Sequence, residues 1–132
     1  MSPLVIALAL LLLGVLIVAV RAATPGLGRA VEKASDADDP TPVVEAIERL
    51  KPSGRSAAFN HAIRQLWDRY ERPLAVALVK VLAERHTDSL IAQYWLKQVM
   101  LVEPDLAREH LSKEFMDGHY KPEVAARCGP VG

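Results

Sequence analysis

The amino-acid sequence predicts an all-α protein with two parts: a single N-terminal transmembrane helix, and a small antiparallel helical bundle or solenoid of about five helices. First, sixteen of the seventeen residues from Leu4 to Val20 are apolar, and Gly14 is the exception. Second, apolar residues after position 41 recur with helical spacing, whereas no run alternates as a β-strand would. Third, the connections between the predicted helices are short, which makes neighbouring helices antiparallel.

Residues 1–22 are predicted to be a transmembrane anchor, because no charged side chain precedes Arg21. As a helix, the uncharged run from Pro3 to Val20 would rise about 27 Å, close to the thickness of a bilayer core. A cleavable signal peptide is the alternative, but it would need a basic start and a shorter apolar stretch. The lipid bilayer is therefore an expected partner through residues 3–20.

The basic residues near this segment all follow it, and they set its predicted orientation. Arg21, Arg29 and Lys33 lie on its C-terminal side. Positive charge beside a membrane segment stays in the cytoplasm. We therefore expect the N-terminus outside and the helical domain in the cytoplasm, with a periplasmic domain as the alternative.

Ala7 and Gly14 are seven residues apart and share one face of the predicted anchor. Small residues on one face let a second transmembrane helix approach closely, so both are candidate partner contacts. The alternative is a helix whose whole surface faces lipid.

Residues 23–41 are predicted to be a linker. Pro25 and the two glycines that follow it break helices. Only one helical turn, over residues 30–34, is expected in this segment. Residues 35–42 are acidic and end in proline, which is typical of a flexible or extended spacer.

Residues 42–118 are predicted to form the helical interaction domain, followed by a tail over residues 119–132. The first helix, residues 42–51, begins at a proline, which suits the first helical turn. The second, residues 55–72, has one apolar stripe that starts at Phe59 and continues at i+3, i+4, i+7, i+8 and i+11.

The third predicted helix, residues 73–86, is apolar on most sides and is therefore placed centrally. The fourth, residues 88–103, has more apolar residues than one stripe needs. The excess at Leu96, Met100 and Leu101 is a candidate partner surface. The fifth, residues 104–117, begins at a proline and ends before a glycine.

The third and fourth helices form a helix-turn-helix unit over residues 73–106. Its small and apolar positions are Val76, Val79, Ala83, Ala92, Leu96, Val99 and Pro104. With these residues the unit resembles α-solenoid repeats of the tetratricopeptide or HEAT kind, although Val76 and Lys80 stand where a tetratricopeptide unit usually has Trp and Gly. The resemblance implies a protein-binding scaffold. A closed five-helix bundle is the alternative architecture.

The charge pattern argues against nucleic acid as a partner, because sixteen basic residues balance sixteen acidic ones. Residues 51–72 are nevertheless net positive. Arg64 and Arg69 in this segment are candidate contacts for an acidic partner. A solvated helix face is the alternative interpretation.

Residues able to perform chemistry are few: four His and one Cys. His110, His119 and Cys128 are nine residues apart in turn, which matches no compact zinc motif. No nucleotide-binding, metalloprotease or hydrolase motif occurs. We therefore expect no enzyme activity, cofactor, metal or small-molecule substrate. A metal- or thiol-dependent enzyme that uses these three residues is the alternative of another class.

Together these features predict a single-pass, membrane-anchored module for protein–protein interaction. It would be an accessory or scaffold subunit of a bacterial-type membrane complex, such as a respiratory, photosynthetic or transport complex. Its partners would be other membrane protein subunits. A transient assembly factor or recruiting adaptor at the membrane is the alternative.

Overall fold

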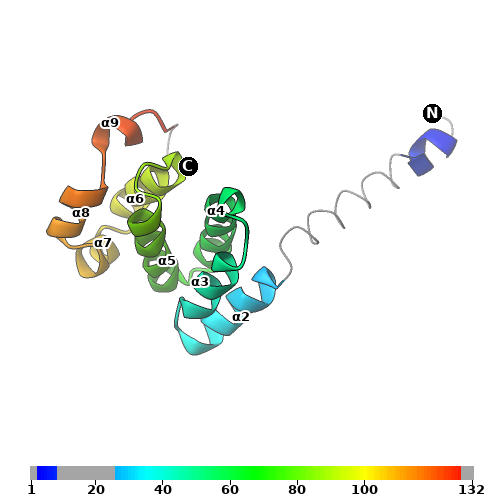
Figure 1. The fold of residues 1–132 in the computed structure, drawn as a ribbon, viewed down its shortest axis with the longest axis horizontal. Coiled ribbons are helices and arrows are strands. Elements are labelled where there is room, and N and C mark those ends of the chain that lie inside the picture. Colours follow the sequence, from blue (N-terminus) through cyan, green and yellow to red (C-terminus); the bar gives the residue numbers. More distant parts are fainter. Residues whose placement is uncertain (1–2, 9–25, 129–132) are drawn as a thin grey trace.

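The structure, a computed structural model, describes residues 3–8 and 26–128, and within these ranges all regular secondary structure is helical (Figure 1). Residues 3–8 are helical. The helices that follow are α2 (Leu27–Ala37), α3 (Thr41–Glu48), α4 (Pro52–Asp68), α5 (Arg72–Arg85), α6 (Leu90–Val102), α7 (Pro104–His110), α8 (Lys113–His119) and α9 (Pro122–Ala125). The all-α part of the predicted fold class is confirmed for these residues.

The predicted transmembrane helix is corrected by this structure. Over residues 3–8 and 26–128, no helix is both long enough and apolar enough to span a bilayer. The remainder of the predicted span, which includes Gly14, lies outside the described residues. The predicted anchor, signal-anchor character and single-pass membrane localisation are therefore not supported.

A helix, α2, occupies most of the segment predicted to be a linker. Its inward residues are Leu27, Ala30, Val31 and Ala34, all buried and spaced at i, i+3, i+4 and i+7. This stripe packs on α3 and α4. Residues 27–37 thus belong to the hydrophobic core, because burial of one apolar face outweighs the nearby glycines and acidic residues.

From α2 to α7, helices pack on the next helix and in part on the next but one (Figure 1). In this way α2 contacts α3 and α4, and α5 contacts α4, α6 and α7. The central helix α5 buries Leu74, Ala75, Val76, Leu78, Val79, Leu82 and Ala83. Half of its fourteen residues are thus buried, which agrees with the central place predicted for this helix.

The predicted fifth helix is divided into α7 and α8 at residues 111–112. Ser112 begins α8, because its hydroxyl accepts a 3.0 Å hydrogen bond from the Phe115 N–H. Gly118, predicted to end the helix, lies inside α8.

One buried side chain on α6, Gln93, fastens the C-terminal part of the domain. Its Nε2 donates to the carbonyl oxygens of Thr87 and His119, both at 2.8 Å. Its Oε1 accepts from the Lys121 N–H at 2.7 Å. The residues after α8 therefore fold back along α6, where α9 packs.

Replacing Val31 by alanine should lower the free energy of unfolding by about 2 kcal/mol, because its side chain is fully buried in the core. Val5, which is half exposed on the helix of residues 3–8, is the matched control. Val5→Ala should change the value by less than about 0.5 kcal/mol. Urea unfolding of the full chain measures both, and equal values would show that α2 is not part of the cooperative core.

Candidate functional site

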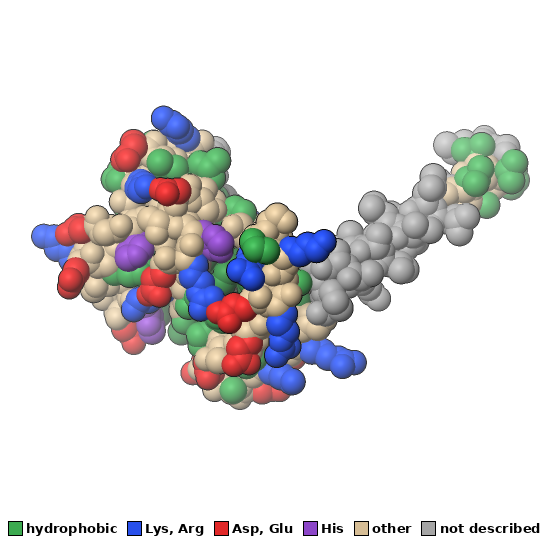
Figure 2. All heavy atoms as spheres, in the orientation of Figure 1, with side chains coloured by type: hydrophobic (Ala, Val, Ile, Leu, Met, Phe, Trp, Pro, Cys, Tyr) green, Lys and Arg blue, Asp and Glu red, His purple; other side chains and the backbone are tan. Residues whose placement is uncertain are grey.

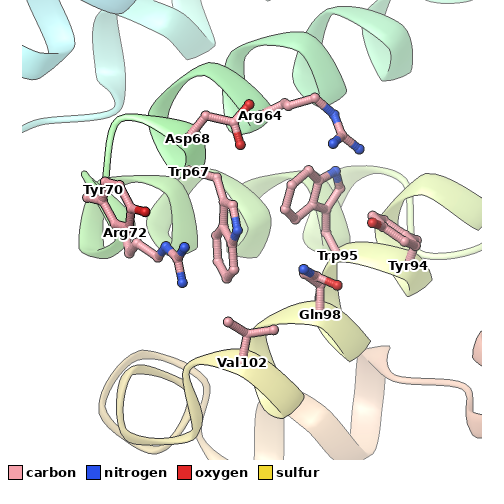
Figure 3. Close-up of a pocket in the computed structure, with 9 residues that line it drawn as sticks. All are labelled: Arg64, Trp67, Asp68, Tyr70, Arg72, Tyr94, Trp95, Gln98 and Val102. Atoms are coloured by element: carbon pink, nitrogen blue, oxygen red, sulfur yellow. The ribbon is translucent and has the colours of Figure 1, made fainter. Parts of the chain in front are cut away.

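A cavity of about 390 Å³ lies where the C-terminal end of α4 and the start of α5 meet α6 (Figure 3). We call it the α4–α6 cavity. It is lined by Arg64, Trp67, Asp68, Tyr70, Arg72, Tyr94, Trp95, Gln98 and Val102. Tryptophan, tyrosine and arginine are the residue types that dominate the binding energy of protein–protein interfaces.

The wall of this cavity is built from two tryptophans on different helices. The rings of Trp67 and Trp95 meet edge to face, with centroids 5.5 Å apart. Trp95 is almost fully buried, and its indole N–H donates a 2.8 Å hydrogen bond to Oδ1 of Asn60 on α4. Tyr94 packs on Trp95 with a centroid distance of 5.4 Å. These contacts fix the orientation of both indole rings.

Arg72 closes one end of the α4–α6 cavity. Its guanidinium carbon lies 4.3 Å from the ring centroid of Trp67 and 5.2 Å from that of Tyr70. Its Nη1 donates a 2.8 Å hydrogen bond to Oε1 of Glu103. Its Nε is buried and has no hydrogen-bond partner in the described part of the chain. The planar guanidinium is thus held between the rings, and its one buried N–H without a partner is that of Nε.

Gln98 lies on α6 and directs its amide toward Trp67 and Trp95 (Figure 3). The residue is only 7% exposed, yet its Oε1 accepts no hydrogen bond. Over residues 3–8 and 26–128, Gln98 Oε1 and Arg72 Nε are the two buried side-chain polar atoms without a partner. Each such atom costs about 1–3 kcal/mol, and both belong to residues that line this one cavity.

Tyr70 adds backbone strain at the same place. Its φ of 61° is left-handed, a region that favours glycine. It ends α4 in a Schellman motif, in which the Glu71 N–H donates to the Leu66 carbonyl at 3.0 Å. The side chain is 80% exposed at the rim of the cavity. Asp38 has the same left-handed conformation at the end of α2, away from this cavity, so the cost at Tyr70 is that of a helix end without glycine.

A second cavity of about 310 Å³ adjoins the first, because Arg64 and Tyr94 line both. The other residues around it are Asn60, Leu90, Ile91, Arg127 and Cys128. The Arg64 guanidinium carbon lies 5.5 Å from the Trp95 ring centroid (Figure 3). We call the two adjoining cavities together the groove along α4 and α6.

Of the sequence-predicted partner contacts, Arg64 lies at this groove. Arg69 lies elsewhere and pairs with Glu32 at 2.5 Å, which joins α4 to α2. That hydrogen bond raises the pKa of the Arg69 guanidinium. Figure 2 shows acidic and basic side chains interspersed over the visible face of the helical part.

The predicted apolar surface on α6 is divided among three environments. Leu96 is fully buried in the core, and Leu101 is 63% exposed. Met100 lines an apolar cavity of about 570 Å³ between α6, α7 and α8. Ala7 is exposed on the helix of residues 3–8, whereas Gly14 lies outside the described residues.

The residues of the alternative enzyme hypothesis are held in separate contacts. His119 stacks on Phe115 with ring centroids 4.2 Å apart, and Cys128 lies near the Leu90 carbonyl. Burial raises the pKa of the Tyr120 hydroxyl, and the nearby Cys128 adds to this effect. In the described part of the chain, no group of three or more His, Cys, Asp or Glu residues could hold a metal ion.

Sequence reasoning missed Trp67, Tyr70, Arg72 and Gln98 as site residues. The first two fall on the predicted apolar stripe that starts at Phe59, and Arg72 is the last residue of the helix predicted over residues 55–72. One signal was available: the segment from Trp67 to Arg72 places two aromatic and two arginine side chains at the end of a helix. Nothing in the sequence indicated that Gln98 would line a cavity.

Comparisons of the chain with protein-family models, with curated proteins and with solved structures found no match. The resemblance to α-solenoid repeats therefore rests on the residues of this chain alone.

Two buried glutamines on α6 offer a paired stability test. Gln98→Leu should leave the free energy of unfolding unchanged or raise it by about 1 kcal/mol, because an unpartnered acceptor is removed. Gln93→Leu should lower it by about 3 kcal/mol, because three backbone groups lose their partner. Urea unfolding with equal losses in both variants would contradict the unpartnered state of Gln98.

Proposed function

We propose that this chain is a helical protein–protein interaction module that binds a segment of a partner protein in the α4–α6 cavity. The module acts as an accessory or scaffold subunit of a protein complex, or as an adaptor that recruits a partner transiently. Stacked helix pairs of the α-solenoid kind supply the frame, and the groove along α4 and α6 supplies the binding face.

One observation carries the proposal: the unpartnered buried side-chain atoms in the described part of the chain gather at one hollow. Both unpartnered buried atoms belong to residues that line it, and the strained Tyr70 lies at its rim. A folded chain tolerates such local costs where a bound partner relieves them. The aromatic and arginine lining supports a protein partner, because these side chains bury large areas with little loss of rotamer entropy.

Selection of random dodecapeptides against the full chain tests this function. We expect a recurring sequence pattern among the bound peptides and dissociation constants in the micromolar range, on the order of 8 kcal/mol of binding free energy. Fluorescence anisotropy of labelled peptides gives the affinities. Failure to enrich any pattern would reject the proposed function.

Replacing Tyr70 by glycine links binding to the cavity. The variant should bind the selected peptides about tenfold more weakly, because an exposed rim aromatic is lost. Its free energy of unfolding should stay within about 1 kcal/mol of the original, since glycine accepts the left-handed backbone.

Asp38→Gly is the matched control. Asp38 has a φ of 51° and ends α2 with the same hydrogen-bond motif, but it does not line the cavity. Its replacement should leave peptide affinity unchanged. An equal loss of affinity in both variants would place the peptide elsewhere on the molecule.

A further inference from the structure

The unpartnered atoms of the α4–α6 cavity restrict the chemistry of its ligand. Gln98 Oε1 is an acceptor that needs a donor, and Arg72 Nε–H is a donor that needs an acceptor. A carboxylate or phosphate has only acceptors, so it would pair with Arg72 and repel the Gln98 oxygen. An ammonium group has only donors, so it fails at Arg72. A peptide backbone presents N–H donors and carbonyl acceptors in turn along its length, so different groups of one segment can satisfy the two atoms on either side of Trp67.

The second cavity adds a preference for charge. Its lining contains the guanidinium groups of Arg64 and Arg127 and no carboxylate. Neither arginine makes an ion pair with another residue of the described chain. Leu90 and Ile91 give the same hollow an apolar side. An acidic residue next to an apolar residue complements this lining.

We infer that the groove takes an extended peptide segment of a partner protein, with one backbone amide N–H seated at Gln98 Oε1, a backbone carbonyl of the same segment at Arg72 Nε, and an adjacent apolar–acidic pair in the second cavity. The inference rests on the proposed function and adds the recognition chemistry. Arg72 is already neutralised by Glu103, and Asp68 lines the first cavity. The negative charge of the ligand therefore belongs to the second cavity.

The seated amide is tested by combining a protein variant with a peptide modification. A peptide selected from the random dodecapeptide library with the full chain is methylated at one backbone nitrogen at a time. One position should lose about tenfold in affinity, the loss typical of one buried hydrogen bond. Gln98→Leu should show a similar loss with the unmodified peptide. The same methylation should then have no further effect on that variant.

Gln65→Leu is the control, because Gln65 lies on α4 and lines neither cavity. It should leave both affinities unchanged. Gln98→Met repeats the test with a side chain of similar length that lacks the acceptor. Circular dichroism and urea unfolding establish that each variant is folded.

The charge preference is tested with the same peptide and its Asp→Asn or Glu→Gln form. The original chain should favour the acidic form at low salt, and the preference should fall as salt is added. Arg64→Gln combined with Arg127→Gln should abolish the preference. Arg49→Gln, exposed after α3 and outside both cavities, should retain it.

Three results would overturn the inference. The first is a selected peptide that Tyr70→Gly weakens but whose affinity is unchanged by Gln98→Leu and by every single methylation. The proposed function would then stand, but the backbone contact at Gln98 would be wrong. The second is a set of bound peptides with no acidic preference. The third is concentration-dependent self-association lost in Gln98→Leu, which would make a second copy of this chain the occupant.

Discussion

The contact between Trp67 and Trp95 sets the spacing of two helices that are not consecutive in the chain. α4 and α6 are separated by α5, and the two indoles meet edge to face between them. Asn60 holds the Trp95 N–H from the α4 side, and Tyr94 packs on the same ring from α6. Because both rings are held, the hollow beside them exists before a ligand arrives. A preformed site avoids part of the entropy cost of binding.

The two glutamines of α6 show how differently one residue type is used on one helix. Gln93 satisfies three backbone groups and joins distant parts of the chain, whereas Gln98 keeps a free acceptor beside aromatic walls. The first is an interaction that specifies the fold. The second costs stability in the isolated chain, and this cost is consistent with a group kept for recognition.

Helical periodicity predicted much of the core, because spacing alone decides which side of a helix is buried. The stripe that starts at Phe59 became the inner side of α4 as far as Trp67, whereas its last predicted member, Tyr70, lies beyond the helix and is exposed. The same spacing from Leu27 to Ala34 was overlooked beside glycines and acidic residues, so α2 was missed. The apolar run near the N-terminus predicted a membrane span that the described structure does not support. The sequence could not predict the cavity, because its shape depends on how α4 and α6 lie relative to each other. The missing hydrogen bond at Gln98 also depends on the side chains that surround it in the folded chain.

The C-terminal part of the domain is attached differently from the rest. α8 has no buried residue, and α9 buries only Ala125. Phe115, Met116 and Tyr120 pack on the core while only partly buried. Polar contacts join the region to α6 through Gln93 and through Lys97, whose Nζ lies 3.4 Å from the Ala125 carbonyl. A region held in this way opens at a lower free energy than the global unfolding of its domain. Its backbone amide hydrogens should therefore exchange with solvent as one group, ahead of those of α4 and α5. This local opening would expose one side of α6 while the contact between Trp67 and Trp95 remains intact.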